Sequence, residues 1–399
     1  MRTRWTRVAF AAVAFLALAV EGDLSKLLAE FESGRAEATE KHMIVPLHIY
    51  GLANRLRSLA SYMQLSKRLN RRLHVSWKIT PECGCEWNDI FESPDRLEAK
   101  NDGIYFEVFQ GNRSLLDEVI ENAAGGVVNI GWNSVVDVPD LESQTTDQRT
   151  IVFALHHSWF TLSGQTCMEY FVGKSHFYRS LRPVQAVVDI VDKVWKHKLE
   201  GRAVVGVHFR KMVEKTDWTL LGQRFEDVTP LHVMADRMKD VLKRRREILF
   251  YVASNDVDSK LSLFDAKYCV SLRVDDAGMT RGAIWGIQVA LAEFILLSRS
   301  ELVMHTFGSS FAQEAAFFGR APELQVRGTG GNIYQSNRAS DPFCGQLSMR
   351  GKELNSKNQF LIKTNASPNS QEEVGTTTTI DLYLCEKFQQ EWGVEGTFC

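Results

Sequence analysis

Residues 203–209, AVVGVHF, decide the fold of the second half of this chain. The segment is an apolar, β-branched run, and three similar runs follow it, each separated from the next by a segment with helical periodicity. The expected strands are 203–209, 248–253, 269–274 and 301–306. The expected helices are 231–242, 257–264, 283–298 and 309–318. Apolar strands that alternate with helices of this length indicate a parallel, doubly wound sheet.

The first half of the chain shows the same alternation less regularly. A strand is expected over residues 43–50, then a helix whose leucines recur at helical spacing, then a second strand over residues 73–77. This order is a βαβ unit. Residues 127–132 and 150–155 are further strand candidates, and Pro183 is expected to open a helix.

The predicted fold class is therefore α/β, with two Rossmann-like, doubly wound domains between terminal segments of other kinds. Arg2, Arg4 and Arg7 precede an uncharged apolar run that would span only about 20 Å as a helix, short of the roughly 30 Å bilayer core. Such a run is typical of a signal peptide, and a short signal anchor is the alternative. The predicted segments are 1–22 (signal peptide or anchor), 23–42 (helical stem), 43–200 and 201–330 (the two domains), and 331–399 (irregular, partly flexible tail).

A lumenal protein of the secretory pathway, in the ER or Golgi or secreted, follows from either reading of the N-terminus. Disulfides are then expected among the seven cysteines, with Cys83 and Cys85 too close to pair with each other and bound to different partners. The cysteines are Cys83, Cys85, Cys167, Cys269, Cys344, Cys385 and Cys399. Two sequons, at Asn112 and Asn365, are compatible with glycosylation. A net charge of −2 gives no indication of a nucleic-acid partner.

Ligands of open α/β sheets bind beyond the carboxyl ends of the strands. Arg210 and Lys211 stand where the strand 203–209 ends, and a guanidinium there can hold a diphosphate through two hydrogen bonds. Two solvated bases at a strand end are the alternative reading. No metal-ligand spacing appears among the cysteines and histidines, so no metal site is expected.

Two other strand ends lead through a glycine into a helix whose free N–H groups suit an anion. One is the turn at Gly51, with Asn54 and Arg55 on the first helical turn; the other contains Ser309 and Ser310. Solvated arginines and simple serine caps are the alternatives. Asp256 and Asp258 form a DxD that some sugar transferases use for a metal, but here a helix cap is favoured.

Three motifs in order resemble the superfamily of α1,6-fucosyltransferases, nodulation fucosyltransferases and protein O-fucosyltransferases. The first is GLANRLR at residues 51–57, followed by VSW at 75–77 and ECG at 82–84. The second is GVHFR at 206–210. The third is LLSRSE at 296–301 with TFGSSF at 306–311.

The resemblance implies a GT-B-like fold, with an acceptor-side first domain and a nucleotide-sugar-binding second domain. It implies GDP-fucose as donor, a glycan or protein as acceptor, and metal-independent, inverting transfer without a cofactor. Arg210 would bind the β-phosphate, Glu293 would read the guanine, Ser310 would meet the phosphates, and Asn54 and Arg55 would line the cleft with Gly51. The implied donor-binding residues are His208, Arg210, Lys211, Glu293, Ser309, Ser310 and Phe311.

The sequence also departs from the pattern of this superfamily. Lys211 stands where a second arginine is common, and the following acid is displaced, which leaves Glu214 and Asp217 as candidates for the general base. Arg210, Glu214 and Asp217 are the predicted catalytic residues. Two alternatives follow from these departures: a related transferase with another nucleotide-sugar donor, and a secreted sugar- or nucleotide-binding module of the same fold without turnover.

Overall fold

The structure is a computed structural model of the whole chain. It describes residues 29, 40–92, 106–110, 119–120, 128–130, 135–154, 159–165, 167–211, 225–272, 280–319, 321, 323–326, 328, 336–337 and 359–360. The expected signal segment, both sequons, Glu214, Asp217, most of the stem and nearly all of the tail lie outside these residues.

The first half of the chain forms a four-stranded parallel sheet with the strand order β3-β2-β1-β5. The strands are β1 (His42–Leu47), β2 (Arg72–Trp77), β3 (Phe106–Phe109) and β5 (Thr150–Val152). Helix α2 (Leu52–Leu69) connects β1 to β2, so the expected βαβ unit is present. The helix ends at Asn70, whose left-handed conformation (φ 49°) suits a helix C-terminus.

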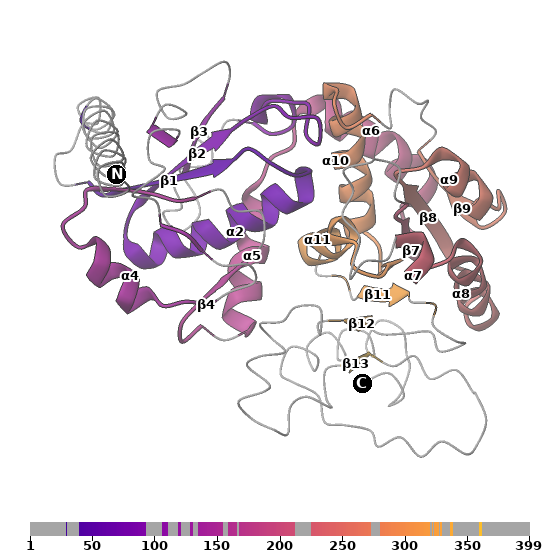
Figure 1. Ribbon diagram of the computed structural model, residues 1–399. Helices are drawn as coiled ribbons and strands as arrows, with labels where there is room; N and C mark the ends of the chain where they lie inside the picture. The colour runs from indigo at the N-terminus through magenta and orange to yellow at the C-terminus, as the bar shows by residue number, and fades with distance from the viewer. Residues whose placement is uncertain are drawn as a thin grey trace, which may run out of the picture.

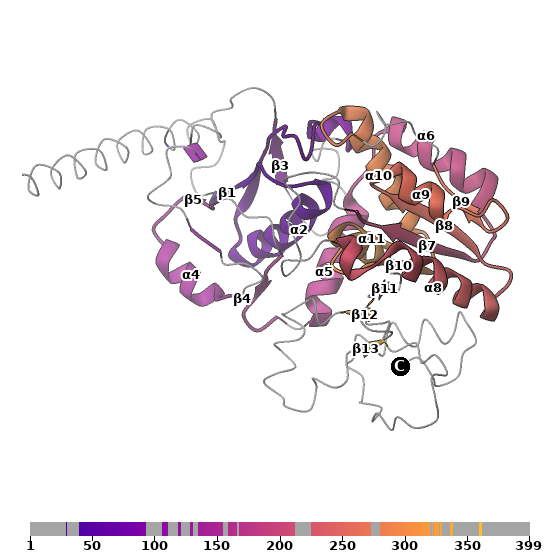
Figure 2. The same cartoon turned by 45° about the vertical axis from the view of Figure 1, so that its right-hand side comes forward.

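The second half forms a five-stranded parallel sheet with the order β11-β10-β7-β8-β9, and its strands are labelled in Figure 2. Figure 1 shows this half of the chain beside the first sheet. The strands are β7 (Val204–Phe209), β8 (Leu249–Ser254), β9 (Cys269–Val270), β10 (Leu302–Thr306) and β11 (Glu323–Val326). The helices between them are α8 (Leu231–Arg244), α9 (Val257–Leu263), α10 (Ile284–Ser298) and α11 (Ser310–Gly319). The predicted parallel α/β sheets are thus confirmed.

Alternate residues of β7 pack on opposite faces of the second sheet. Val205 and Val207 face the core beneath α8 and α9, whereas Val204 belongs to a larger core that also contains residues of the first sheet. Helix α10 lies in that larger core and is buried on most of its surface, which explains why it is apolar on every side. Gly206 allows α10 to pack closely against β7, because a Cβ at this position would lie only 2.9 Å from Cδ2 of Leu297.

The remaining elements surround the two sheets. They are η1 (Trp87–Asp89), β4 (Val135–Val136), α4 (Val138–Thr145), β6 (Thr161–Leu162), α5 (Cys167–Ser180), α6 (Gln185–Val194), its π-helical continuation η3 (Trp195–Leu199), α7 (Phe225–Val228), β12 (Ser336–Asn337) and β13 (Gln359–Phe360). No helix among the described residues is both long and apolar enough to cross a membrane.

Four expectations about local structure differ from the result. Pro183 does not open a helix: it bridges to Phe91, and α6 begins at Gln185. Of the strand expected over 127–132 the structure describes residues 128–130, where Val128 forms an isolated bridge to Phe153. Of the strand expected over 269–274, residues 269–272 are described and only two of them form β9, and the short strand β11 was not expected.

The expected disulfides are not found among the cysteines whose side chains the structure describes. Cys83, Cys85 and Cys269 are free thiols. All three are buried, since they pack in the hydrophobic cores. The prediction of different disulfide partners for Cys83 and Cys85 is therefore wrong in this structure. The side chains of the other cysteines lie outside the described residues.

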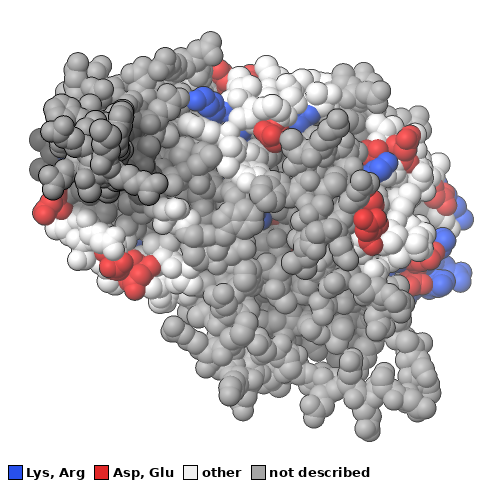
Figure 3. All heavy atoms as spheres, in the orientation of Figure 1, with Lys and Arg blue, Asp and Glu red and all other residues white. Residues whose placement is uncertain are grey.

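Charges of both signs are interspersed on the described part of the face shown in Figure 3. Helix α8, for example, pairs Lys239 with Asp236 and Lys243 with Asp240. This mixed surface agrees with the small net charge of −2.

Candidate functional site

A cavity of about 420 Å³ lies at the carboxyl ends of β1, β7 and β8, between the two halves of the chain. The first half contributes residues 49–54 and Glu82; the second half contributes the ends of β7 and β8, one face of α10 and the start of α11. This volume is in the usual range for a small-molecule site. The cavity is thus where the strand-end rule places a ligand.

His208 forms part of the cavity wall and is almost fully buried. Its Nδ1 lies 3.1 Å from the hydroxyl oxygen of Ser309, and its ring centre lies 5.1 Å from that of Phe311. Burial lowers the pKa of His208 well below its usual value, and the charge of Arg210 lowers it further. The imidazole is therefore neutral at physiological pH.

Arg210 supplies a positive charge to the same wall. Its backbone N–H donates to the hydroxyl of Thr306 over 2.9 Å, which ties the end of β7 to the end of β10. Its guanidinium carbon lies 5.7 Å from the ring centre of Phe225, on α7. This arrangement fixes the backbone of Arg210 and leaves its side chain on the cavity surface.

Helix α11 begins at the cavity, with Ser309, Ser310 and Phe311 all among the lining residues. Gly308 makes the turn into it with a positive φ of 76°, a conformation that glycine adopts without strain. The first N–H groups of a helix have no partners within the helix, and its dipole is positive at this end. An anion near Ser310 would therefore meet both the helix terminus and the guanidinium of Arg210.

Glu293 closes the cavity on the side of α10. Its Oε1 lies 2.5 Å from Nζ of Lys260 on α9, and both side chains are about 7% exposed. Burial raises the pKa of Glu293, while Lys260 acts in the opposite direction. Lys260 could not be identified as a partner from the sequence, because the two residues are 33 positions apart.

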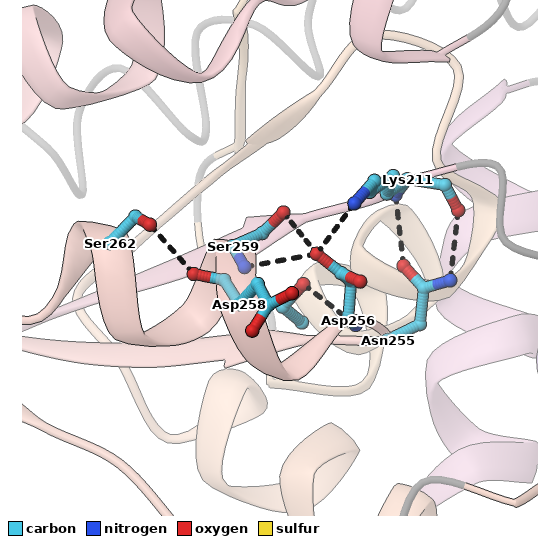
Figure 4. Close-up of polar contacts among 7 residues, drawn as sticks. Lys211, Asn255, Asp256, Asp258, Ser259 and Ser262 are labelled. Atoms are coloured by element: carbon cyan, nitrogen blue, oxygen red, sulfur yellow. Dashed lines mark hydrogen bonds and ion pairs between the residues drawn. The ribbon is translucent and has the colours of Figure 1, made fainter.

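Lys211 does not line the cavity. Its backbone exchanges two hydrogen bonds with the side chain of Asn255, and its Nζ lies 3.1 Å from Oδ2 of Asp256 (Figure 4). Asp256 caps α9, because the same oxygen accepts from the N–H and the hydroxyl of Ser259. The predicted helix cap at Asp256 is thus confirmed, and the ammonium group of Lys211 is bound to the capping carboxylate.

The turn at Gly51 places Asn54 on the cavity, and its buried Oδ1 accepts no hydrogen bond from the described residues. Arg55 does not line the cavity, contrary to expectation. It is 1% exposed and donates to the carbonyls of Tyr50 and Lys78 and to the hydroxyl of Thr80. The helical rotation from residue 54 to residue 55 turns its side chain toward the end of β2.

Tyr50, Glu82 and Arg281 also line the cavity and were not anticipated. Tyr50 has a positive φ of 66°, which is rare for a residue with a side chain and marks a constrained position. A strained residue of this kind could not be found from the sequence pattern, whereas Glu82 lies within the ECG motif.

No group of three or more His, Cys, Asp or Glu that could hold a metal lies in the described part of the chain.

Comparison with known proteins gave matches only among solved structures. No protein-family model matches the chain, and no curated protein sequence matches it. The chain is similar to the fucosyltransferase NodZ from Bradyrhizobium, with 18% identity, a TM-score of 0.46, and 74% of this chain and 97% of that chain covered.

Two further structures are similar to the chain at comparable levels. One is an Arabidopsis thaliana FUT1 mutant in complex with GDP (14% identity, TM-score 0.45, 77% of this chain and 76% of that chain). The other is POFUT1 in complex with GDP-fucose (10% identity, TM-score 0.44, 72% and 97%). All three are fucosyltransferases, the superfamily that the sequence motifs resemble. Similarity at these values does not carry an activity from those proteins to this chain.

Proposed function

We propose that this protein is a glycosyltransferase that transfers fucose from GDP-fucose to a glycan or protein acceptor, with inversion and without a metal. The observation that carries the proposal is the convergence of Arg210 and the N-terminus of α11 on one cavity at the strand ends. Two positive elements on one wall suit a diphosphate, which is the leaving group of such a donor.

The diphosphate end of the donor would lie against Arg210, Ser309 and Ser310. When the bond from the sugar C1 to the β-phosphate oxygen breaks, negative charge grows on that oxygen. A guanidinium and a helix N-terminus fixed in advance stabilise that charge in the transition state more than in the ground state. His208 is neutral and supports Ser309 through the contact between its Nδ1 and the serine hydroxyl.

The nucleobase end would lie toward Glu293. Guanine presents N–H donors on its Watson–Crick edge, and the carboxylate oxygen Oε2 of Glu293 accepts no hydrogen bond from the described residues. Burial raises the pKa of Glu293, and Lys260 acts in the opposite direction, in favour of the charged carboxylate. This proposed role follows the superfamily resemblance, and it predicts a preference for guanine over adenine.

Metal independence is proposed from the state of the DxD. Oδ2 of Asp256 is already engaged by Lys211 and by two groups of Ser259, so a cation could use this oxygen only by displacing three contacts. Transfer should therefore survive a chelator. Glu214 and Asp217 stay candidates for the base only on sequence grounds, and Glu214→Gln and Asp217→Asn would each test one of them.

The placement of the protein in the cell also remains a proposal. The apolar run at the N-terminus favours a signal peptide or short anchor, with the acceptor-side domain over residues 43–200 and the donor-side domain over 201–330 in the lumen. Fractionation of cells that express the full chain would check this. Recovery in the cytosol would contradict it.

The donor is tested by calorimetric titration of the protein with GDP, UDP and ADP, followed by hydrolysis assays with GDP-fucose and UDP-sugars. GDP should bind most tightly, and GDP should be released from GDP-fucose. Binding of UDP alone would replace fucose by another donor. No binding of any nucleotide diphosphate would remove the transferase proposal.

A second candidate is a binding module that keeps the fold without turnover. The observation in its favour is Lys211, whose ammonium group is bound to Asp256 instead of lying in the cavity. This candidate predicts that GDP-fucose binds as tightly as GDP and is recovered intact after long incubation with an acceptor panel. Release of GDP above the uncatalysed rate would exclude it.

A further inference from the structure

Two carboxylates are among the described residues that line the cavity, Glu82 and Glu293. Glu293 is buried and bound to Lys260. Glu82 is only half-buried, and its carboxylate forms no hydrogen bond or ion pair with the described residues. Glu82 is therefore the carboxylate on this surface that can take up a proton from a ligand.

Glu82 lies in a turn that is fixed at both ends. The N–H of Thr80 donates to the carbonyl of Cys83 over 3.2 Å, and the N–H of Cys83 donates to the carbonyl of Thr80 over 3.0 Å. The guanidinium of Arg55 donates a hydrogen bond to the hydroxyl of Thr80. On the other side, the N–H of Gly84 donates to the carbonyl of Arg281 over 2.8 Å.

Gly84 makes this attachment close enough to exclude any side chain. A Cβ on Gly84 would lie 2.1 Å from the carbonyl carbon of Gly282. The turn thus contacts the segment that leads into α10, and residues of α10 also line the cavity. A carboxylate on so constrained a turn is held in place before a ligand arrives, as efficient proton transfer requires.

Three charged or titratable groups lie close enough to Glu82 for its charge to act on them. The charge of Glu82 acts on the phenol of Tyr50, the guanidinium of Arg55 and the thiol of Cys83. Arg281, from the segment before α10, acts on the same thiol and also lines the cavity. Arg55, bonded to Thr80, and Arg281, whose carbonyl accepts from Gly84, thus place positive charge at the turn that carries Glu82.

We propose that Glu82 is the catalytic base that deprotonates the acceptor hydroxyl, an inference that rests on the proposed transferase function. As the acceptor oxygen forms its bond to C1 of the sugar, its proton passes to the Glu82 carboxylate. The bond from C1 to the β-phosphate oxygen breaks, and its electron pair leaves with GDP. One bond forms, one breaks, and the proton is accounted for.

The placement of the groups suits an inverting displacement. Glu82 comes from the first half of the chain, whereas Arg210 and the start of α11 come from the second half and face the leaving group. Inversion requires the nucleophile and the leaving group on opposite sides of C1. A base on one half and the diphosphate site on the other half meet that requirement.

The test uses the full-length protein and water or azide as the acceptor. In Glu82→Ala, we expect GDP to bind within twofold of the wild type and GDP-fucose hydrolysis to fall by about 100-fold or more. Azide needs no deprotonation, so sodium azide should raise GDP release from Glu82→Ala at least about tenfold and yield fucosyl azide. Glu200→Ala, which removes an exposed carboxylate elsewhere, should behave as the wild type.

Glu82→Gln gives a second measurement that a packing defect would not mimic. Its amide keeps the volume of the carboxylate but cannot accept a proton, so hydrolysis should fall as it does in Glu82→Ala, at unchanged GDP affinity. Hydrolysis by both variants within twofold of the wild type would overturn the assignment of Glu82, and so would a loss that azide leaves unchanged. If the wild type itself neither binds GDP nor cleaves GDP-fucose, the transferase proposal falls and the base falls with it.

Discussion

Nζ of Lys260 and Oε1 of Glu293 form a buried ion pair, 2.5 Å long, that joins α9 to α10 at the edge of the cavity. A carboxylate buried without such a partner would be protonated in preference to charged. Lys260 therefore favours the charged form of an acid beside a ligand site, against the cost of desolvation.

Lys260→Met should lower the free energy of unfolding by about 3–5 kcal/mol, because it leaves the carboxylate of Glu293 buried without a partner. The double variant Lys260→Met/Glu293→Leu should recover most of this loss. Urea unfolding at neutral pH measures both. Lys239→Met, which breaks an exposed pair with Asp236, is the matched control and should change little. Equal stabilities of Lys260→Met and its control would show that the buried pair is unimportant.

A second buried network should determine how firmly α11 is held at the cavity. Nζ of Lys174 on α5 lies 2.8 and 2.7 Å from the two carboxylate oxygens of Glu314, which also accepts from the hydroxyl of Tyr178. Tyr178→Phe removes one hydrogen bond to a charged group and should lower the free energy of unfolding by about 1.5–3 kcal/mol.

Lys174→Met leaves Glu314 charged and unpaired and should cost about 3–5 kcal/mol. Because α11 starts at the cavity, we also expect weaker GDP binding at a temperature where the variant is still folded. Thermal unfolding and titration with GDP check the two effects. Lys196→Met, in an exposed pair with Asp192, should alter neither. A stable Lys174→Met variant with normal GDP affinity would contradict this role.

His208 should make stability depend on pH in acid. Its pKa in the folded protein lies well below the ordinary value of 6.5, first because of burial and then because of Arg210. Between the two values the unfolded chain binds a proton that the folded chain does not, so stability is full above pH 6.5 and declines as the pH falls below it.

The variant His208→Gln should therefore show a shallower decline, by up to about 1.4 kcal/mol per pH unit. Urea unfolding at several pH values between 7.5 and 5 would measure it, with the exposed His232→Gln as control. Identical pH dependences of the wild type and His208→Gln would refute the buried neutral imidazole.

Lys211 should contribute little to donor binding. Its ammonium group is bound to Asp256, and it does not reach the cavity. Lys211→Ala should therefore change the GDP affinity by less than about twofold, although it removes one contact from the cap of α9. A loss of tenfold or more would mean that the lysine moves to the phosphates when the ligand binds. That result would agree with the donor-binding role expected for Lys211 from its motif.

The sequence predicted the elements of the second sheet well, because their apolar runs follow one period each. The strand-end rule then placed Arg210, Ser309, Ser310 and Asn54 in one cavity without knowledge of the family. Glu293 came from the resemblance and also lies there. These residues line one cavity because the position of each follows from the element that carries it.

Side-chain direction and distant partners were not predictable in this way. Arg55 follows Asn54 in the chain, yet it is buried against β2 and holds the turn that carries Glu82. Lys260 and Lys174 find their carboxylates through packing of helices far apart in the sequence. Local periodicity contains no information on such pairs, and the free Cys83 and Cys85 show the same limit for spacing rules.

The most direct measurement of the central claim is calorimetric titration of GDP and of guanosine into the wild type and Arg210→Ala. If Arg210 and the start of α11 bind the diphosphate, the variant should lose about 10- to 100-fold in GDP affinity and none for guanosine. Arg244→Ala, an exposed arginine at the end of α8, should bind both as the wild type does. GDP affinities of the wild type and Arg210→Ala that agree within twofold would contradict the account.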